Sequence, residues 1–125
     1  MQTFFDRVGG EQTFQKLASE FYRGVSQDPL LSPMYPPDDL AGAERRLRMF
    51  LEQYWGGPNT YQVERGHPRL RMRHAQFPIG PNARDAWLKH MRAAVDSLEL
   101  PVADDAELWD YLQRAAHAML NTFEN

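Results

Sequence analysis

The chain has 125 residues and a formal net charge of −3, a length that suits one domain with a single core. The modest, mixed charge argues against a general nucleic-acid binder. The chain contains no run of 18 apolar residues, so we expect no membrane-spanning segment. There is no cysteine, which removes disulfides, thiolate haem ligation, cysteine-ligated clusters and cysteine nucleophiles. The first residues show no charged-then-apolar signal pattern, so we expect a cytoplasmic protein.

The first two long helices are predicted from apolar residues that recur at helical spacing. A helix over residues 11–27 is followed by a turn at 29–35 and a second helix over 39–54. The first face consists of Phe14, Leu17, Ala18, Phe21 and Val25. The second face consists of Leu40, Ala43, Leu47, Phe50, Leu51 and Tyr54. Asp38 or Asp39 can cap the second helix, and the glycines and proline at 56–58 should end it.

The second half of the chain contains shorter segments and then two further long helices. We expect a weak helical turn at 59–65, a short helix at 69–75, and a long helix from about residue 82, where Pro81 suits the first turn. Its apolar face consists of Trp87, Leu88, Met91, Ala94, Val95 and Leu98. A last helix over 104–123 should bury Leu108, Leu112, Ala115, Ala116, Met119 and Phe123. No segment alternates as a strand would, so the sequence predicts an all-α fold of crossed helix pairs over residues 1–125.

Two consecutive stretches carry a resemblance to a known family. The run DDLAGAERRLRMFLEQYWGGP at 38–58 and the run YQVERGHPRLRMRHAQF at 61–77 resemble the distal and proximal helices of group II truncated haemoglobins, the bacterial O-type branch. Shorter matches are collinear with them, at Val8-Gly9-Gly10, Phe21-Tyr22, Tyr35-Pro36 and Ala86-Trp87-Leu88. The resemblance spans about residues 4–123 and implies a truncated globin, a two-over-two α-helical sandwich that encloses haem b.

His74 is the candidate iron ligand. Imidazole can donate a lone pair to iron, although a histidine in a basic surface loop is the alternative from the residues alone. The resemblance implies that His74 is the proximal haem ligand. His67 is more simply explained as part of a loop, and a zinc site built from His67 and His74 would lack further ligands at suitable spacing. His90 should be structural and His117 solvated.

Three aromatic residues are candidates for binding a small ligand. Read alone, Tyr22 is a tyrosine at the edge of a helix face, Tyr35 is a turn aromatic, and Trp87 is a core tryptophan. The resemblance implies that all three donate hydrogen bonds to a ligand on the haem iron. In the family context, Ala43 stands where many globins place a distal histidine or glutamine. Its small side chain leaves a gap and offers no hydrogen bond, so Tyr22, Tyr35 and Trp87 must recognise the ligand.

The remaining candidate haem contacts are apolar walls and basic partners for the propionates. The walls are Leu47, Phe50, Leu51, Met72 and Phe77, for which ordinary core packing is the alternative. Arg46, three residues past Ala43, is the first choice for a propionate pair, and Arg73 is the second. A solvated surface position is the alternative for both arginines.

The resemblance implies reversible binding of O2, CO and NO, with small anionic ligands as further candidates. Three donors predict slow oxygen release, which suits NO or reactive-species redox chemistry or sensing better than bulk oxygen transport. The sequence does not decide whether the protein is an enzyme, nor whether it is a homodimer. No GxGxxG fingerprint is present, so a reductase would be a separate partner. The alternative is a haem-free helical adaptor that retains the globin fold.

Overall fold

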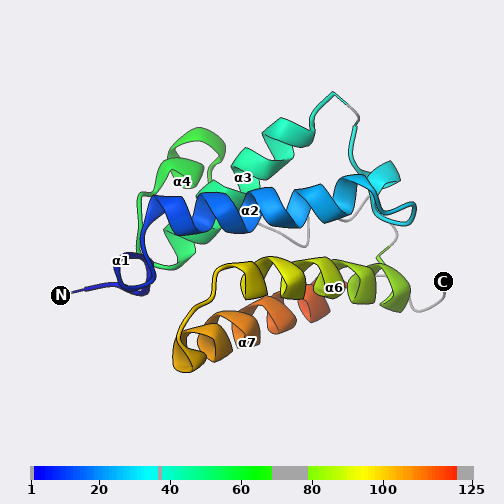
Figure 1. Ribbon diagram of the computed structural model, residues 1–125. Helices are drawn as coiled ribbons and strands as arrows, with labels where there is room; N and C mark the ends of the chain where they lie inside the picture. Colours follow the sequence, from blue (N-terminus) through cyan, green and yellow to red (C-terminus); the bar gives the residue numbers. More distant parts are fainter. Residues whose placement is uncertain (1, 37, 69–78, 121–125) are drawn as a thin grey trace.

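The computed structural model describes residues 2–36, 38–68 and 79–120, and these are helical with no strand among them. The helices are α1 (Phe4–Arg7), α2 (Glu11–Ser26), the 3-10 helix η1 (Ser32–Met34), α3 (Leu40–Tyr54), α4 (Thr60–Arg65), α6 (Pro81–Ser97) and α7 (Val102–Ala118). In Figure 1, α2 and α3 lie above the antiparallel pair α6 and α7. α2 is central because it packs against both α3 and α6. The predicted two-over-two sandwich is therefore confirmed.

The predicted apolar face of α2 is confirmed and forms the centre of the core. Leu17, Ala18, Phe21 and Val25 are completely buried, and Phe14 nearly so. Burial of each large side chain contributes on the order of 2 kcal/mol before the entropy of ordering it is counted. Tyr22, which the periodicity places only at the edge of this face, is also buried.

α3 has the predicted length, but two details of its sequence interpretation are wrong. Asp39 is the residue before the helix, yet its side chain caps no backbone N–H. The carboxylate accepts a hydrogen bond from Arg46 Nη2 at 2.7 Å instead. Tyr54, predicted to face inward, is 50% exposed and stacks on Tyr111 with ring centroids 4.0 Å apart. The chain leaves the helix as predicted at Gly56, whose φ of +94° favours glycine.

The second layer is held together by core residues and by ion pairs at its edges. Pro81 occupies the first turn of α6 as predicted, and α7 begins at Val102, two residues earlier than expected. Arg92 of α6 pairs with Asp105 of α7 at 2.6 Å. α1, which the sequence interpretation missed, is tied to α7 by Arg7 and Asp104 at 3.0 Å.

Some predictions fall outside the part of the chain that the structure describes. The short helix at 69–75 and the end of the last helix at 121–123 belong to this group. Among the described helices, none is long and apolar enough to cross a membrane.

Candidate functional site

Three elements bring their aromatic side chains together in one place. Tyr22 and Phe21 come from α2, Tyr35 follows η1, and Trp87 comes from α6. Phe21 is the hub, with ring centroids 5.0 Å from Tyr22 and 5.3 Å from Trp87. The Tyr35 ring meets Tyr22 edge to face at 5.4 Å. We name these four residues the aromatic cluster, and its three hydrogen-bond donors are the three that the sequence singled out.

The two phenols of the aromatic cluster are held in their neutral, donating form. Burial raises the pKa of Tyr22 well above its usual range, and the neighbouring Tyr35 raises it further. Burial also raises the pKa of Tyr35, while Tyr22 beside it acts in the opposite direction. Both phenols are therefore neutral at pH 7, as any tyrosine is unless its pKa is lowered, and each carries one O–H that can donate a hydrogen bond.

α3 faces the aromatic cluster with a mostly apolar surface. Ala43 is buried, and Leu47 and Phe50 are partly buried against the same core. Leu51 is almost completely inside that core. Two charges of α3 act on the pKa of Tyr22, which the Arg46 guanidinium lowers and the Glu44 carboxylate raises. Apolar walls beside a few neutral donors are the chemistry that suits a flat, largely apolar cofactor carrying a small polar ligand.

Arg46 lies at the rim of this region and is already engaged. Its guanidinium reaches back to Asp39 and is about one third exposed. That contact and the arginine charge hold the pKa of Asp39 below its usual range. The bridge passes over Gly42, where a Cβ would lie 2.2 Å from Asp39 Oδ1. Arg46 is thus paired with Asp39, and its pairing with a propionate stays a prediction.

The other half of the predicted site lies outside the described residues. His74, Met72, Arg73 and Phe77 all belong to that segment. Among the described residues there is no group of three side chains that could hold a metal ion. His67 is exposed, and His117 is exposed as predicted.

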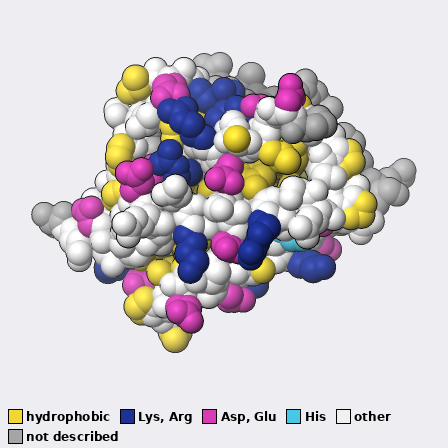
Figure 2. Space-filling view, turned by 45° about the horizontal axis from the view of Figure 1, so that its top comes forward, with side chains coloured by type: hydrophobic (Ala, Val, Ile, Leu, Met, Phe, Trp, Pro, Cys, Tyr) yellow, Lys and Arg dark blue, Asp and Glu magenta, His cyan; other side chains and the backbone are white. Residues whose placement is uncertain are grey.

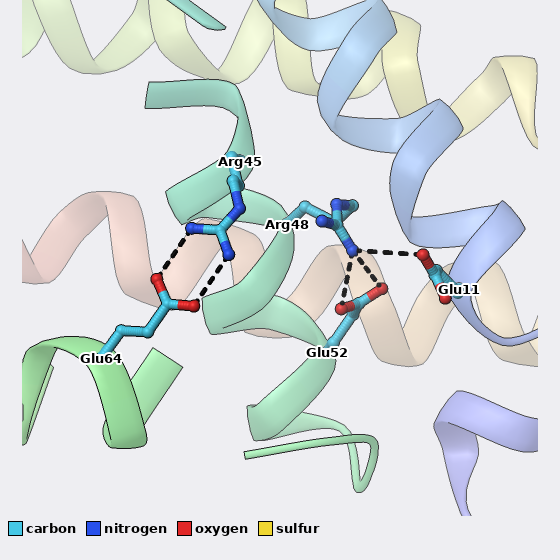
Figure 3. Close-up of polar contacts among 5 residues, drawn as sticks. All are labelled: Glu11, Arg45, Arg48, Glu52 and Glu64. Atoms are coloured by element: carbon cyan, nitrogen blue, oxygen red, sulfur yellow. Dashed lines mark hydrogen bonds and ion pairs between the residues drawn. The ribbon is translucent and has the colours of Figure 1, made fainter. Parts of the chain in front are cut away.

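A second polar arrangement, which the sequence interpretation missed, joins α3 to its neighbours. Arg45 binds Glu64 of α4 through two hydrogen bonds of 2.8 Å. Arg48 pairs with Glu52 at 3.2 Å and approaches Glu11 of α2 at 3.7 Å (Figure 3). We name these five residues the charged lattice. The one available signal was the spacing of four between Arg48 and Glu52, which places both on one helix face.

The surface over these helices is mixed rather than uniformly charged. Figure 2 shows basic side chains gathered in the upper half of the view, next to acidic ones and to a patch of hydrophobic surface. On this face the basic side chains do not form a continuous stripe.

Comparisons with known proteins agree with this geometry. The family model described as bacterial-like globin matches residues 3–121. A group 2 truncated haemoglobin of Bacillus subtilis is 41% identical over 115 residues, which cover 92% of this chain and 86% of the relative.

Solved structures match over the whole fold. The X-ray structure of a thermostable haemoglobin from the actinobacterium Thermobifida fusca superposes with a TM-score of 0.96 at 60% identity, covering 98% of this chain and all of that one. A group II truncated haemoglobin from Bacillus anthracis superposes with a TM-score of 0.94 at 41% identity, covering all of this chain and 95% of that one.

Proposed function

Since this chain belongs to the bacterial-like globin family and resembles group II truncated haemoglobins along almost its entire length, we propose that it binds haem b through His74 and releases O2 slowly. Membership of the family implies a haem cofactor and haem-based binding of small ligands. The iron ligand, the haem type and the slow release are the parts that we add.

The observation that supports slow release is the aromatic cluster. Haem, when bound, supplies an iron that takes a diatomic ligand. Tyr22, Tyr35 and Trp87 would then each donate a hydrogen bond from a different element, and burial raises the pKa of both phenols further above neutrality. Each donor in a dry pocket contributes about 1 kcal/mol. A ligand that must break several such bonds leaves slowly.

The hydrogen-bond donors of the proposed site come from α2, α6 and the corner at Tyr35 because α3 supplies none at Ala43. Ala43 has no polar atom in its side chain, so α3 offers space there rather than a hydrogen bond. Leu47 and Phe50 would form the apolar wall on this side, with Leu51 behind them, and Met72 and Phe77 the wall on the other. Arg46 and Arg73 would pair with the propionates, which for Arg46 means exchanging Asp39 for a second carboxylate.

The physiological role that suits these features is redox chemistry or sensing. CO and NO should bind at the same position as O2, and small anionic ligands could also receive the three hydrogen bonds. A separate reductase would supply electrons for any turnover with NO or reactive species. We place the protein in the cytoplasm, consistent with its lack of cysteine.

The test begins with a visible spectrum of the purified protein, where a strong Soret band is expected. A haem-free adaptor would show none. His74→Ala should lose haem or show a grossly altered ferrous spectrum, whereas His117→Ala is the matched control. His117 is exposed, and its ring hydrogen-bonds the Gln113 carbonyl of its own helix at 2.9 Å. Normal haem retention and an unchanged deoxy spectrum in His74→Ala would contradict the proposed ligand.

A further inference from the structure

A mostly buried hydrogen bond between His90 and Asp28 joins the same three elements that carry the aromatic cluster. His90 of α6 donates from Nε2 to Asp28 Oδ2 at 2.6 Å, and the two side chains are only 16% and 15% exposed. Asp28 follows α2 at the start of the corner that leads to Tyr35. His90 lies three residues beyond Trp87, on the same side of α6.

Asp28 also organises the corner itself. Its second carboxylate oxygen accepts the Leu30 N–H at 2.8 Å, and its backbone carbonyl accepts the Ser32 N–H at 2.9 Å. The Ser32 carbonyl in turn accepts the N–H of Tyr35 at 3.1 Å. The position of the Tyr35 backbone is therefore linked by hydrogen bonds to Asp28, and through Asp28 to α6.

The imidazole is also wedged against α2. A Cβ added at Gly24 would lie 2.5 Å from His90 Nδ1 and 3.1 Å from Cγ, so the ring rests on the bare helix backbone. Phe21, one turn earlier on α2, contacts Trp87. The same two helices thus meet twice, once inside the aromatic cluster and once at His90.

The chemistry of the pair favours a firm connection. The hydrogen bond from His90, followed by that from Leu30, lowers the pKa of Asp28, so the carboxylate is ionised at neutral pH. A short, mostly buried bond to an ionised acceptor is stronger than a neutral one. Glu20, Arg23 and Asp96 surround the shallow groove that leaves one edge of His90 open to solvent.

We infer that His90 and Asp28 are positioning residues that fix Tyr22, Tyr35 and Trp87 relative to one another and thereby set the rate of ligand release. The inference rests on the proposed function, because it concerns donors acting on a haem-bound ligand. We assign the pair no contact with the ligand or the cofactor. It acts by holding α2, the corner and α6 at one separation, and hydrogen bonds to a ligand weaken steeply when a donor shifts.

The experiment measures oxygen dissociation and the infrared C–O stretching band of the carbon monoxide complex. The band reports the positive dipoles at the ligand and does not depend on turnover. His90→Leu should raise the oxygen dissociation rate about three- to fivefold and move the band to higher wavenumber, because one hydrogen bond is weakened. Asp28→Asn, which keeps an acceptor for Leu30, should shift both in the same direction by less. The double variant should not exceed His90→Leu, since the two residues act as one unit.

Two controls separate positioning from general stability. His90→Gln places an amide N–H where Nε2 was, and it should restore the wild-type rate and band. Asp105→Asn breaks the pair with Arg92 on the other side of α6. It should lower the melting temperature and leave the rate and the band unchanged.

The outcomes distinguish this inference from the proposed function. A Soret band together with an unchanged rate and band in His90→Leu would overturn the inference alone, and so would equal effects in Asp105→Asn. If His90→Leu does not fold, a His90→Gln protein that releases oxygen as fast as Trp87→Phe would equally overturn it. No Soret band in the wild-type protein would overturn both.

Discussion

The aromatic cluster and the charged lattice flank the same central helices but satisfy their polar groups in opposite ways. In the cluster the rings of Tyr22 and Tyr35 meet edge to face, and both phenols are neutral, with their pKa values raised by burial. In the lattice every drawn carboxylate already faces a guanidinium, as between Arg45 and Glu64 (Figure 3). Neutral donors in a dry place remain available to a ligand, whereas paired charges on a helix surface serve the fold.

The contrast assigns different consequences to similar substitutions. Removing a donor from the aromatic cluster should change ligand release and little else. Removing a charge from the lattice should change the free energy of unfolding. Whether the protein becomes more or less stable should depend on how buried the charged group is. Glu52 is nearly completely buried, while Glu64 is exposed, so even the lattice divides into two kinds of pair.

The largest effect is expected for Trp87→Phe. Losing the indole N–H removes about 1–2 kcal/mol from the bound state, which corresponds to a roughly five- to thirtyfold faster oxygen release. Stopped-flow measurement of the dissociation rate checks this value. Tyr22→Phe and Tyr35→Phe should act in the same direction but not additively, because the donors share one ligand.

The control for this measurement is the same substitution elsewhere. Trp109 lies on α7 under the guanidinium of Arg92, 4.8 Å from its ring centre. Trp109→Phe should leave oxygen release unchanged. A rate for Trp87→Phe within twofold of wild type would remove that residue from the site.

The second effect concerns the buried carboxylate of the lattice. Burial raises the pKa of Glu52, and the Arg48 guanidinium lowers it only in part. A carboxyl whose folded pKa is raised favours the folded state at low pH, and that contribution is lost as pH rises through the folded pKa. Glu52→Gln should therefore be as stable as wild type near pH 4 and more stable at pH 7, by up to about 1 kcal/mol.

Urea unfolding at the two pH values measures this difference. The amide keeps a hydrogen bond to Arg48 but carries no charge to desolvate. If Glu52→Gln is clearly less stable than wild type at pH 7, the ionised pair of Glu52 and Arg48 stabilises the fold. The buried and the exposed ion pairs of the charged lattice would then both be stabilising.

A smaller effect is expected for Arg46, which lies between the two regions. Arg46→Ala should speed haem transfer to an acceptor globin by at most about fivefold, because a partly exposed pair contributes little. The effect should be greatest at low salt, where pairing in the wild-type protein is least screened. Arg45→Ala, one residue away and tied to Glu64, should leave transfer unchanged. Equal rates for wild type and Arg46→Ala at every ionic strength would leave Arg46 as a partner of Asp39 alone.

The smallest effect is expected for Glu64→Gln. The pair with Arg45 has good geometry, but both side chains are largely in water. The melting temperature should stay within experimental error of wild type at high salt and fall slightly at low salt. A large loss at high salt would mean that this pair behaves as a buried one.

Much of the fold could be predicted because long helices repeat their apolar residues at a fixed spacing. All five apolar residues predicted for the α2 face are buried, since they recur at a regular helical spacing, and the helix ends one residue earlier than predicted. α1 was missed because four residues are too few to show a period. The burial of Glu52 was missed because a charged side chain at the edge of a helix face is expected to be exposed to solvent unless its ion-pair partner is known.

The sequence could name candidate residues for the site but not their arrangement, and their roles stay predictions. Nothing in the spacing of Tyr22, Tyr35 and Trp87 places them together, because they lie on three elements that meet only through tertiary packing. The family resemblance supplied that placement for the described donors. Asp39 shows that even a local prediction can fail. Its position before α3 predicts a hydrogen bond from its side chain to the helix backbone, but the carboxylate binds Arg46, seven residues away, instead.

The contact between Gly24 and His90 constrains which substitutions this chain can accept, and in what order. Alanine at position 24 would collide with the imidazole and cost about 1–3 kcal/mol, unless position 90 had first become smaller. A smaller residue at 90 without an N–H would in turn remove the hydrogen bond that Asp28 accepts from the imidazole. Both of these single steps are unfavourable, although the two made together need not be. A mutational scan should therefore find epistasis among Gly24, Asp28 and His90.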